Sequence, residues 1–237
     1  MTTLEPTTTT APTRTASIAG VPLQHSLPAL VVHQALRREL RLAGPVVQQT
    51  EEGDTRRARV LAHHLGLVLD GLHHHHQIED DLVWPPLRAR VGDDARPVIA
   101  VMEEQHEAID RSVQTITDVV TVWCTRACAE VRDRLCDELQ FLVELLEVHL
   151  ELEERVVLPL AEQLLTDSEW RHIGEEADRR QPRAGRILSF GMLQHEGDPA
   201  VLASMLATAP LPVRVLVPRL ARRAYRRHAT AIYGGLP

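Results

Sequence analysis

The chain has 237 residues, of which 44% are hydrophobic and 25% charged, and its net charge is −7. The negative charge argues against attraction of the whole protein to nucleic acid, and no apolar run approaches the roughly 20 residues of a membrane span. Aromatic residues make up only 3%, while Leu, Ala, Val and Arg are abundant, which favours helices over sheets. The composition therefore predicts an all-α globular protein.

The first 22 residues are rich in Thr and Pro and predict a disordered leader. They lack the continuous apolar segment of a secretory signal peptide. The three cysteines lie within one helical segment, and an odd number of them suits a reducing compartment. We therefore expect a cytoplasmic protein.

Four long segments carry apolar residues at the three- and four-residue spacing of amphipathic helices. Breaks at Gly44-Pro45 and Pro85-Pro86 separate them. The helices are predicted at residues 27–43, 54–84, 94–123 and 127–165. Because the connections are short, we predict an up-down-up-down four-helix bundle over residues 23–165.

Residues 166–237 have a different texture and predict a small helical C-terminal extension that packs on the bundle. Ser168 is a candidate cap for a short helix that ends near Ala177. Asp198-Pro199 opens another short helix, and a last helix is predicted over 212–233. No helix is expected between residues 178 and 197.

A repeated motif gives the strongest functional signal. His75 is followed by acids at +4 and +5 and by a proline at +10, and the same pattern follows His149, 74 residues later. His33 and His106, each central in the preceding predicted helix, are 73 residues apart. The chain thus contains two matched helix pairs, each with one isolated histidine and one His-x-x-x-Glu helix.

This spacing suits a metal centre. Residues four apart lie about 6 Å from each other on one helix face, so an imidazole and a carboxylate can converge on one point. Four helices that direct such ligands inward can enclose two metal ions. Imidazole together with carboxylate suits iron, whereas structural zinc sites favour thiolates.

The motif resembles that of the hemerythrin-like, or HHE cation-binding, family over about residues 26–165, and the C-terminal extension resembles that of actinobacterial members. The resemblance implies a non-haem centre of two iron ions with an oxo or hydroxo bridge, in which two carboxylates bridge the irons. The ligands that it implies are His33, His75, Glu79, His106, His149 and Glu153.

The sequence departs from oxygen-carrying hemerythrins on the third helix, where those proteins have a His-x-x-x-His pair. Here Met102 and Asp110 flank His106, so a fifth histidine is missing from its expected place. Each iron would then lack about one ligand, which favours turnover of a small oxidant over storage of dioxygen. Asp110 or Glu103 is an alternative additional ligand.

The run His73-His74-His75-His76 leaves the register open. Successive helical residues point about 100° apart, so at most two of the four can face the bundle interior. Pro85 at +10 selects His75, but His76 pairs equally well with Asp80 at +4 and is the alternative register.

The motif predicts a protein that reacts with peroxide, dioxygen or nitric oxide in oxidative or nitrosative stress defence, with catalase- or peroxidase-like activity as one form. A non-catalytic oxygen or iron sensor or carrier is the alternative. The arginine-rich last helix is compatible with a solvated face, pairing with the acidic bundle, or a membrane-surface or nucleic-acid patch. We expect a small-molecule oxidant as partner and no nucleic acid.

Overall fold

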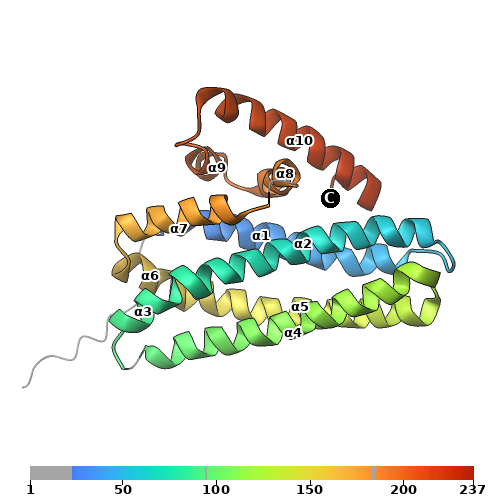
Figure 1. The fold of residues 1–237 in the computed structure, drawn as a ribbon, viewed down its shortest axis with the longest axis horizontal. Coiled ribbons are helices and arrows are strands. Elements are labelled where there is room, and N and C mark those ends of the chain that lie inside the picture. Colours follow the sequence, from blue (N-terminus) through green and yellow to red (C-terminus); the bar gives the residue numbers. More distant parts are fainter. Residues whose placement is uncertain (1–22, 94, 183–184) are drawn as a thin grey trace, which may run out of the picture.

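The computed structural model describes residues 23–93, 95–182 and 185–237, so the predicted disordered leader lies outside the described residues. Four long helices lie side by side and alternate in direction (Figure 1). They are α1 (Leu27–Gln48), α2 (Thr55–Leu82), α4 (Arg96–Arg126) and α5 (Ala129–Leu152). The predicted all-α bundle is confirmed, and the described part of the chain contains no strand. None of its helices is both long and apolar enough to cross a membrane.

The bundle core is aliphatic because each long helix buries a single stripe. On α5 the stripe predicted from the leucine spacing is fully buried, from Leu135 through Leu142 to Leu150. The stripe packs against the matching stripes of the other three helices, which contribute Leu40, Leu61, Leu65, Ile109 and Ile116. This apolar packing fixes the rotation of each helix, and so decides which polar residues must also face inward.

The prediction that Gly44-Pro45 ends the first helix was wrong. The helix continues to Gln48 with Pro45 inside it. Ala43 and Val47 on either side are buried in the core. Packing of this last turn therefore outweighs the hydrogen bond that proline cannot donate.

Proline interrupts α2 and α5 at corresponding places. After α2 the chain turns into α3 (Trp84–Arg90), which has proline in its first turn. After α5 it passes through a single π-helical turn, η1 (Glu153–Val157), into α6 (Leu158–Leu164). Such π turns are rare and frequent at functional sites, and this one begins at a predicted metal ligand.

The extension consists of α7 (Asp167–Arg180), α8 (Arg186–Glu196), α9 (Pro199–Met205) and α10 (Leu211–Tyr233). The cap of α7 is Thr166 in a capping box with Glu169, and not Ser168 as predicted. Helix α8 was not predicted. A Cβ on its Gly191 would lie 2.4 Å from the carbonyl oxygen of Ala221, so close packing against α10 accounts for a residue of low helix propensity.

Candidate metal centre

All six predicted ligands point into the interior of the bundle at one level. His33 comes from α1, His106 from α4 and His149 from α5. Glu79 lies on α2 one turn after His75, and Glu153 is the first residue of η1. Every one of them is buried except His75, which is nearly so. The spacing of the motif therefore brings the predicted residues together.

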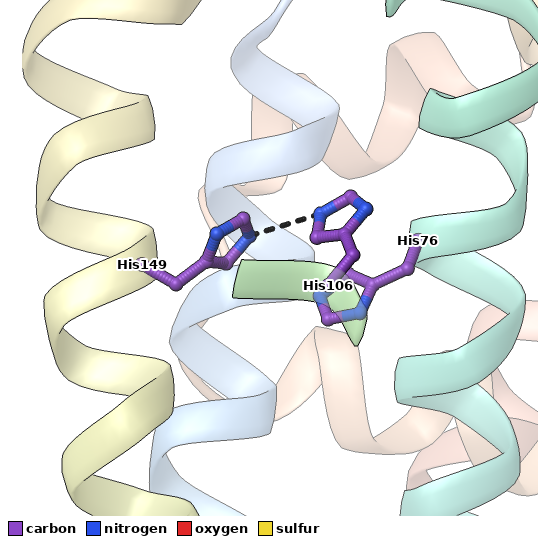
Figure 2. A group of neighbouring side chains, drawn as sticks. All are labelled: His76, His106 and His149. Atoms are coloured by element: carbon purple, nitrogen blue, oxygen red, sulfur yellow. Dashed lines mark hydrogen bonds between the residues drawn. The ribbon is translucent and has the colours of Figure 1, made fainter. Parts of the chain in front are cut away.

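Their donor atoms form two neighbouring groups, each compact enough to hold a metal ion. In the first group the ligand atoms of His76, His106 and His149 all lie within 4.8 Å of one another (Figure 2). The second group meets the same limit and consists of His33, His75, Glu79 and Glu153. The site thus has seven potential ligands and not six.

The two glutamates lie between the groups. Glu79 places Oε1 3.4 Å from Nε2 of His75 and Oε2 3.5 Å from Nε2 of His106. Glu153 places Oε2 3.4 Å from Nε2 of His33 and 3.6 Å from Nε2 of His149. Each carboxylate therefore faces one imidazole of each group, as a bridging ligand would.

Outer hydrogen bonds fix the orientation of three imidazoles. Nδ1 of His106 donates to Asp80 at 2.7 Å, and Nδ1 of His33 donates to Glu154 at 2.9 Å. Both acceptors are the +5 acids of the repeated motif, so each motif orients the isolated histidine of the other helix pair. Nδ1 of His149 donates to Oε1 of Gln105 at 3.1 Å. These bonds keep the proton on Nδ1 and leave Nε2 with a free lone pair, the usual arrangement of metal-binding histidines.

The resulting lone pairs face each other. Nε2 of His106 lies 3.3 Å from Nε2 of His149, and neither carries a proton when Nδ1 is the donor. The contact between Nε2 of His33 and Nε2 of His75, at 2.9 Å, differs, because Nε2–H of His75 can donate to the lone pair of His33. The two facing lone pairs of His106 and His149 repel each other unless a cation lies between or beside them. The donor set therefore fits metal ions.

The electrostatics lead to the same conclusion. Burial, reinforced by the neighbouring histidines, lowers the pKa of His75 and His76 well below the usual value and that of His149 to about 2. Burial and the neighbouring Glu153 raise the pKa of Glu79 well above its usual value. The imidazoles are thus held neutral, as metal ligands must be.

Several donor atoms of this cluster are buried without a hydrogen-bond partner among the described residues. They are both ring nitrogens of His76, Oε2 of Glu79 and both oxygens of Glu153. Leaving such atoms unpaired costs about 1–3 kcal/mol each, and more for a charged group. Bound cations would remove this cost.

The sequence argument left His76 only as an alternative register, but both His75 and His76 face inward. The ring of His76 stacks on that of His106 with centroids 4.0 Å apart. The signal in the sequence was the pair of adjacent histidines itself, which can serve two neighbouring ions from one helix. A further imidazole therefore comes from α2 and not from the third long helix.

The residues considered as substitutes on that helix do not join the cluster. Met102 is buried in an apolar cluster with Trp84 and Val157. Asp110 lies on the surface, where His73 is its partner, and Glu103 forms an ion pair with Arg88. The geometry thus offers no ligand from either Asp110 or Glu103.

A groove of about 230 Å³ lies beside the cluster, between α4 and α5. Its walls are mainly apolar and include Ala108, Ile109 and Phe141. Gln105 belongs to the groove and also accepts the hydrogen bond of His149. One amide side chain therefore separates the groove from a candidate ligand.

Comparison with known proteins agrees with this geometry. Residues 30–161 match the family model of the hemerythrin HHE cation binding domain. The chain is 28% identical over 150 residues to the iron-sulfur cluster repair protein YtfE of Musicola paradisiaca (strain Ech703), a match that covers 60% of this chain and 67% of that protein. No solved structure matches the chain significantly.

Proposed function

The chain belongs to the hemerythrin HHE cation-binding family, and from this premise we propose that its bundle holds two iron ions that react with a small oxidant. The observation that carries the proposal is the pair of donor groups joined by Glu79 and Glu153. Imidazole and carboxylate donors suit iron, and neither group contains a thiolate. Bound iron would supply redox chemistry that no side chain of the cluster offers.

The donors are divided unequally. His76, His106 and His149 would hold one ion and His33 and His75 the other, and Glu79 and Glu153 each lie near one histidine of both groups. An iron ion held by His33 and His75 would have one imidazole fewer than an ion held by His76, His106 and His149. We expect exogenous ligands to bind beside His33 and His75.

The protein residues around the centre hold and orient the ligands. Asp80 and Glu154 keep the Nδ1 protons of His106 and His33 in place, and the charge of Glu154 is held in turn by Arg37 at 2.6 Å. Such outer carboxylates raise the basicity of the imidazoles. Burial excludes bulk water from the ligand atoms, which limits side reactions.

The size and lining of the α4–α5 groove favour a small, weakly polar reactant. Its mainly apolar walls suit an uncharged molecule such as dioxygen or nitric oxide better than a charged metabolite, and Gln105 places the groove beside the donor group that contains His149. We propose a role in oxidative or nitrosative stress defence. The name of the relative from Musicola paradisiaca refers to iron-sulfur cluster repair, a function that also involves protein-bound iron.

His76 favours a second candidate function. The sequence argument for turnover over storage depended on a missing fifth imidazole, and His76 lies where it can supply that imidazole. One nearly saturated ion beside one open ion is the arrangement that a reversible oxygen carrier or sensor needs. Carriage and oxidant turnover are therefore both compatible with this donor set.

The test is to load the purified protein with ferrous iron and measure metal content and reactivity. We expect close to two irons per chain and consumption of hydrogen peroxide. Oxygen uptake that reverses on argon flushing, with no peroxide consumption, would replace turnover by carriage. A stoichiometry near one iron, or a preference for zinc, would contradict the di-iron centre.

A further inference from the structure

Helix α10 has an unusual distribution of charge. It contains six arginines and no acidic residue, on a chain whose net charge is −7. Elsewhere most buried or half-buried arginines have carboxylate partners, as Arg37, Arg38 and Arg180 do. Within residues 23–93, 95–182 and 185–237, none of the six on α10 forms an ion pair. They are Arg214, Arg219, Arg222, Arg223, Arg226 and Arg227.

The side chains of α10 divide into two faces. Ala221, Tyr225 and Ala229, spaced four residues apart, are buried against the rest of the molecule. Arg219, Arg223 and Arg227 have the same four-residue spacing, and each lies two positions before one of these buried residues. Two positions correspond to about 200° around the helix, so the arginines point outward. The exposed strip, called here the α10 outer face, consists of Leu216, Arg219, Leu220, Arg223 and Arg227.

The outer face is apolar as well as basic. Leu216 and Leu220, one turn apart, are 54% and 53% exposed. At the start of the helix Leu211 and Val215 are 71% and 51% exposed. Figure 1 shows α10 on the side of the extension away from the bundle. Leu216 and Leu220 share this strip with the guanidinium groups, and Leu211 and Val215 add exposed aliphatic surface at the start of the helix, so α10 is an amphipathic, basic surface helix.

We propose that the α10 outer face binds the surface of an anionic lipid bilayer. Guanidinium groups pair with headgroup phosphates through parallel hydrogen bonds, and exposed leucines reach the boundary of the acyl chains. The intramolecular alternative is neutralisation by the acidic bundle, and no ion pair of this kind forms among the residues that the structure describes. Binding in this orientation turns the negatively charged bundle away from the negatively charged membrane.

Two other occupants fit the observations less well. A nucleic-acid backbone would use the arginines but would leave Leu211, Leu216 and Leu220 in water. A second copy packed through the same face would bring its own Arg219, Arg223 and Arg227 against these, and like charges at contact distance repel. A bilayer surface is the partner that uses both components of the face.

The experiment is flotation of the full-length protein with vesicles of phosphatidylcholine, with or without about one third phosphatidylglycerol. We expect binding only to the anionic vesicles and weaker binding at higher salt. Each arginine near such a surface contributes about a fivefold change in binding. The double variant Arg223→Gln/Arg227→Gln should therefore bind about 25-fold more weakly, and Leu216→Ser/Leu220→Ser should also lose binding.

Matched controls test whether the effect belongs to this face. Val60→Ser/Val122→Ser removes two exposed aliphatic residues from the bundle, and Arg111→Gln/Arg134→Gln removes two exposed arginines from it. Both should bind as the unmodified protein does. Equal binding to neutral vesicles, unchanged binding of the α10 variants, or a mobility shift with duplex DNA in the absence of vesicle binding would overturn the proposal. So would concentration-dependent dimerisation that the leucine variant abolishes.

Discussion

Two buried carboxylate clusters lie in the same molecule, and they are satisfied to very different degrees. Glu79 and Glu153 in the bundle have oxygens without a hydrogen-bond partner among the described residues, and Glu79 has a raised pKa. Glu39, six residues after His33 on α1, is also almost fully buried. It is completely paired. The difference distinguishes a site that is arranged for a ligand from one that holds two parts of the fold together.

Glu39 is the anchor of the C-terminal extension. Its Oε1 accepts a hydrogen bond from Tyr225 at 2.7 Å, and its Oε2 accepts one from Tyr233 at 2.6 Å. These are the only two tyrosines of the chain. Arg38 donates to the same carboxylate at 2.7 Å and to the carbonyl oxygen of Met192 at 2.8 Å.

A directed chain of hydrogen bonds completes this cluster. Because Tyr233 donates its only proton to Glu39, Nε2–H of His64 must donate to the tyrosine oxygen, 2.9 Å away. Nδ1 of His64 then accepts from His228 at 3.0 Å. Burial alone would raise the pKa of Glu39, but the hydrogen bonds from both tyrosines and Arg38 together lower it. Every proton of the cluster is thus assigned without an added ion.

The largest expected effect is an opposite response of the two clusters to one chemical change. Glu153→Gln removes a fully buried carboxyl group whose oxygens have no hydrogen-bond partner among the described residues, so it should abolish binding of both irons and yet stabilise the metal-free protein by about 1–3 kcal/mol. Glu39→Gln keeps one acceptor oxygen, but its amide NH2 must face either Tyr233 or the pair Tyr225 and Arg38, which are all donors, and Arg38 loses its buried counter-charge. The variant should therefore destabilise the protein by about 3 kcal/mol. Iron analysis and urea unfolding of both variants, without metal, measure this contrast.

Glu39→Gln also serves as the control for metal binding, since it is a buried glutamate on a helix that carries a ligand. It should retain close to two irons per chain at a temperature where it remains folded. Retention of iron by Glu153→Gln, or a stability change of the same sign in both variants, would show that the two clusters do not differ as described.

The next effect concerns His76. His76→Ala removes one of the three imidazoles in the group with His106 and His149, so iron content should fall toward one per chain. His73→Ala is the matched control, because the side chain of His73 is about half exposed and lies beside Asp110 on the surface, outside both donor groups. Equal iron loss in both variants would remove His76 from the ligand set.

The bundle was predictable because periodicity and a repeat specify it. The six motif residues converge because a helix places positions four apart on one face, and the core leucines fix which face that is. His76 was not assigned as a ligand, because helical spacing was used to select one of the two adjacent histidines as the residue that faces inward. The structure shows that both histidines face inward, because His75 lies with His33, Glu79 and Glu153, and His76 lies with His106 and His149.

The extension was predicted less well, because its positions depend on contacts distant in sequence. In the sequence, Glu39 cannot be distinguished from the other charged residues of α1, because its partners Tyr225 and Tyr233 lie nearly 200 residues later. Helix α8 has a glycine in its interior whose purpose is visible only in the packing against Ala221. Local helix propensity predicts neither the pairing of Glu39 with the two tyrosines nor the packing of α8 against α10.

A smaller effect is expected from the outer carboxylates. Asp80→Asn and Glu154→Gln keep hydrogen-bond acceptors next to His106 and His33 but remove the charge that stabilises the Nδ1 proton. Iron affinity should fall about 10- to 100-fold, without loss of the two-iron stoichiometry at saturating metal. Competition with a chelator measures the affinity. Asp81→Asn, an exposed neighbour that pairs with Arg180, is the control and should leave affinity unchanged.

The smallest effect follows from the lowered pKa of His64, which burial brings to about 4 although the charge of Glu39 opposes the shift. The folded protein holds this imidazole neutral, whereas the unfolded chain takes up a proton below about pH 6.5. Stability from His64 is therefore present above pH 6.5 and is lost as the pH falls toward 4, because the unfolded state binds more protons in that interval. Between pH 7 and pH 5.5 the loss should be about 1 kcal/mol. His64→Gln keeps a donor for Tyr233 and cannot be protonated. The free energy of unfolding of both proteins is measured in urea as a function of pH. The difference between the two profiles is the contribution of His64, because the metal-site histidines are the same in both proteins. Parallel pH profiles for the two proteins would show that His64 does not titrate in this way, and that protonation elsewhere controls how the extension is held to the bundle.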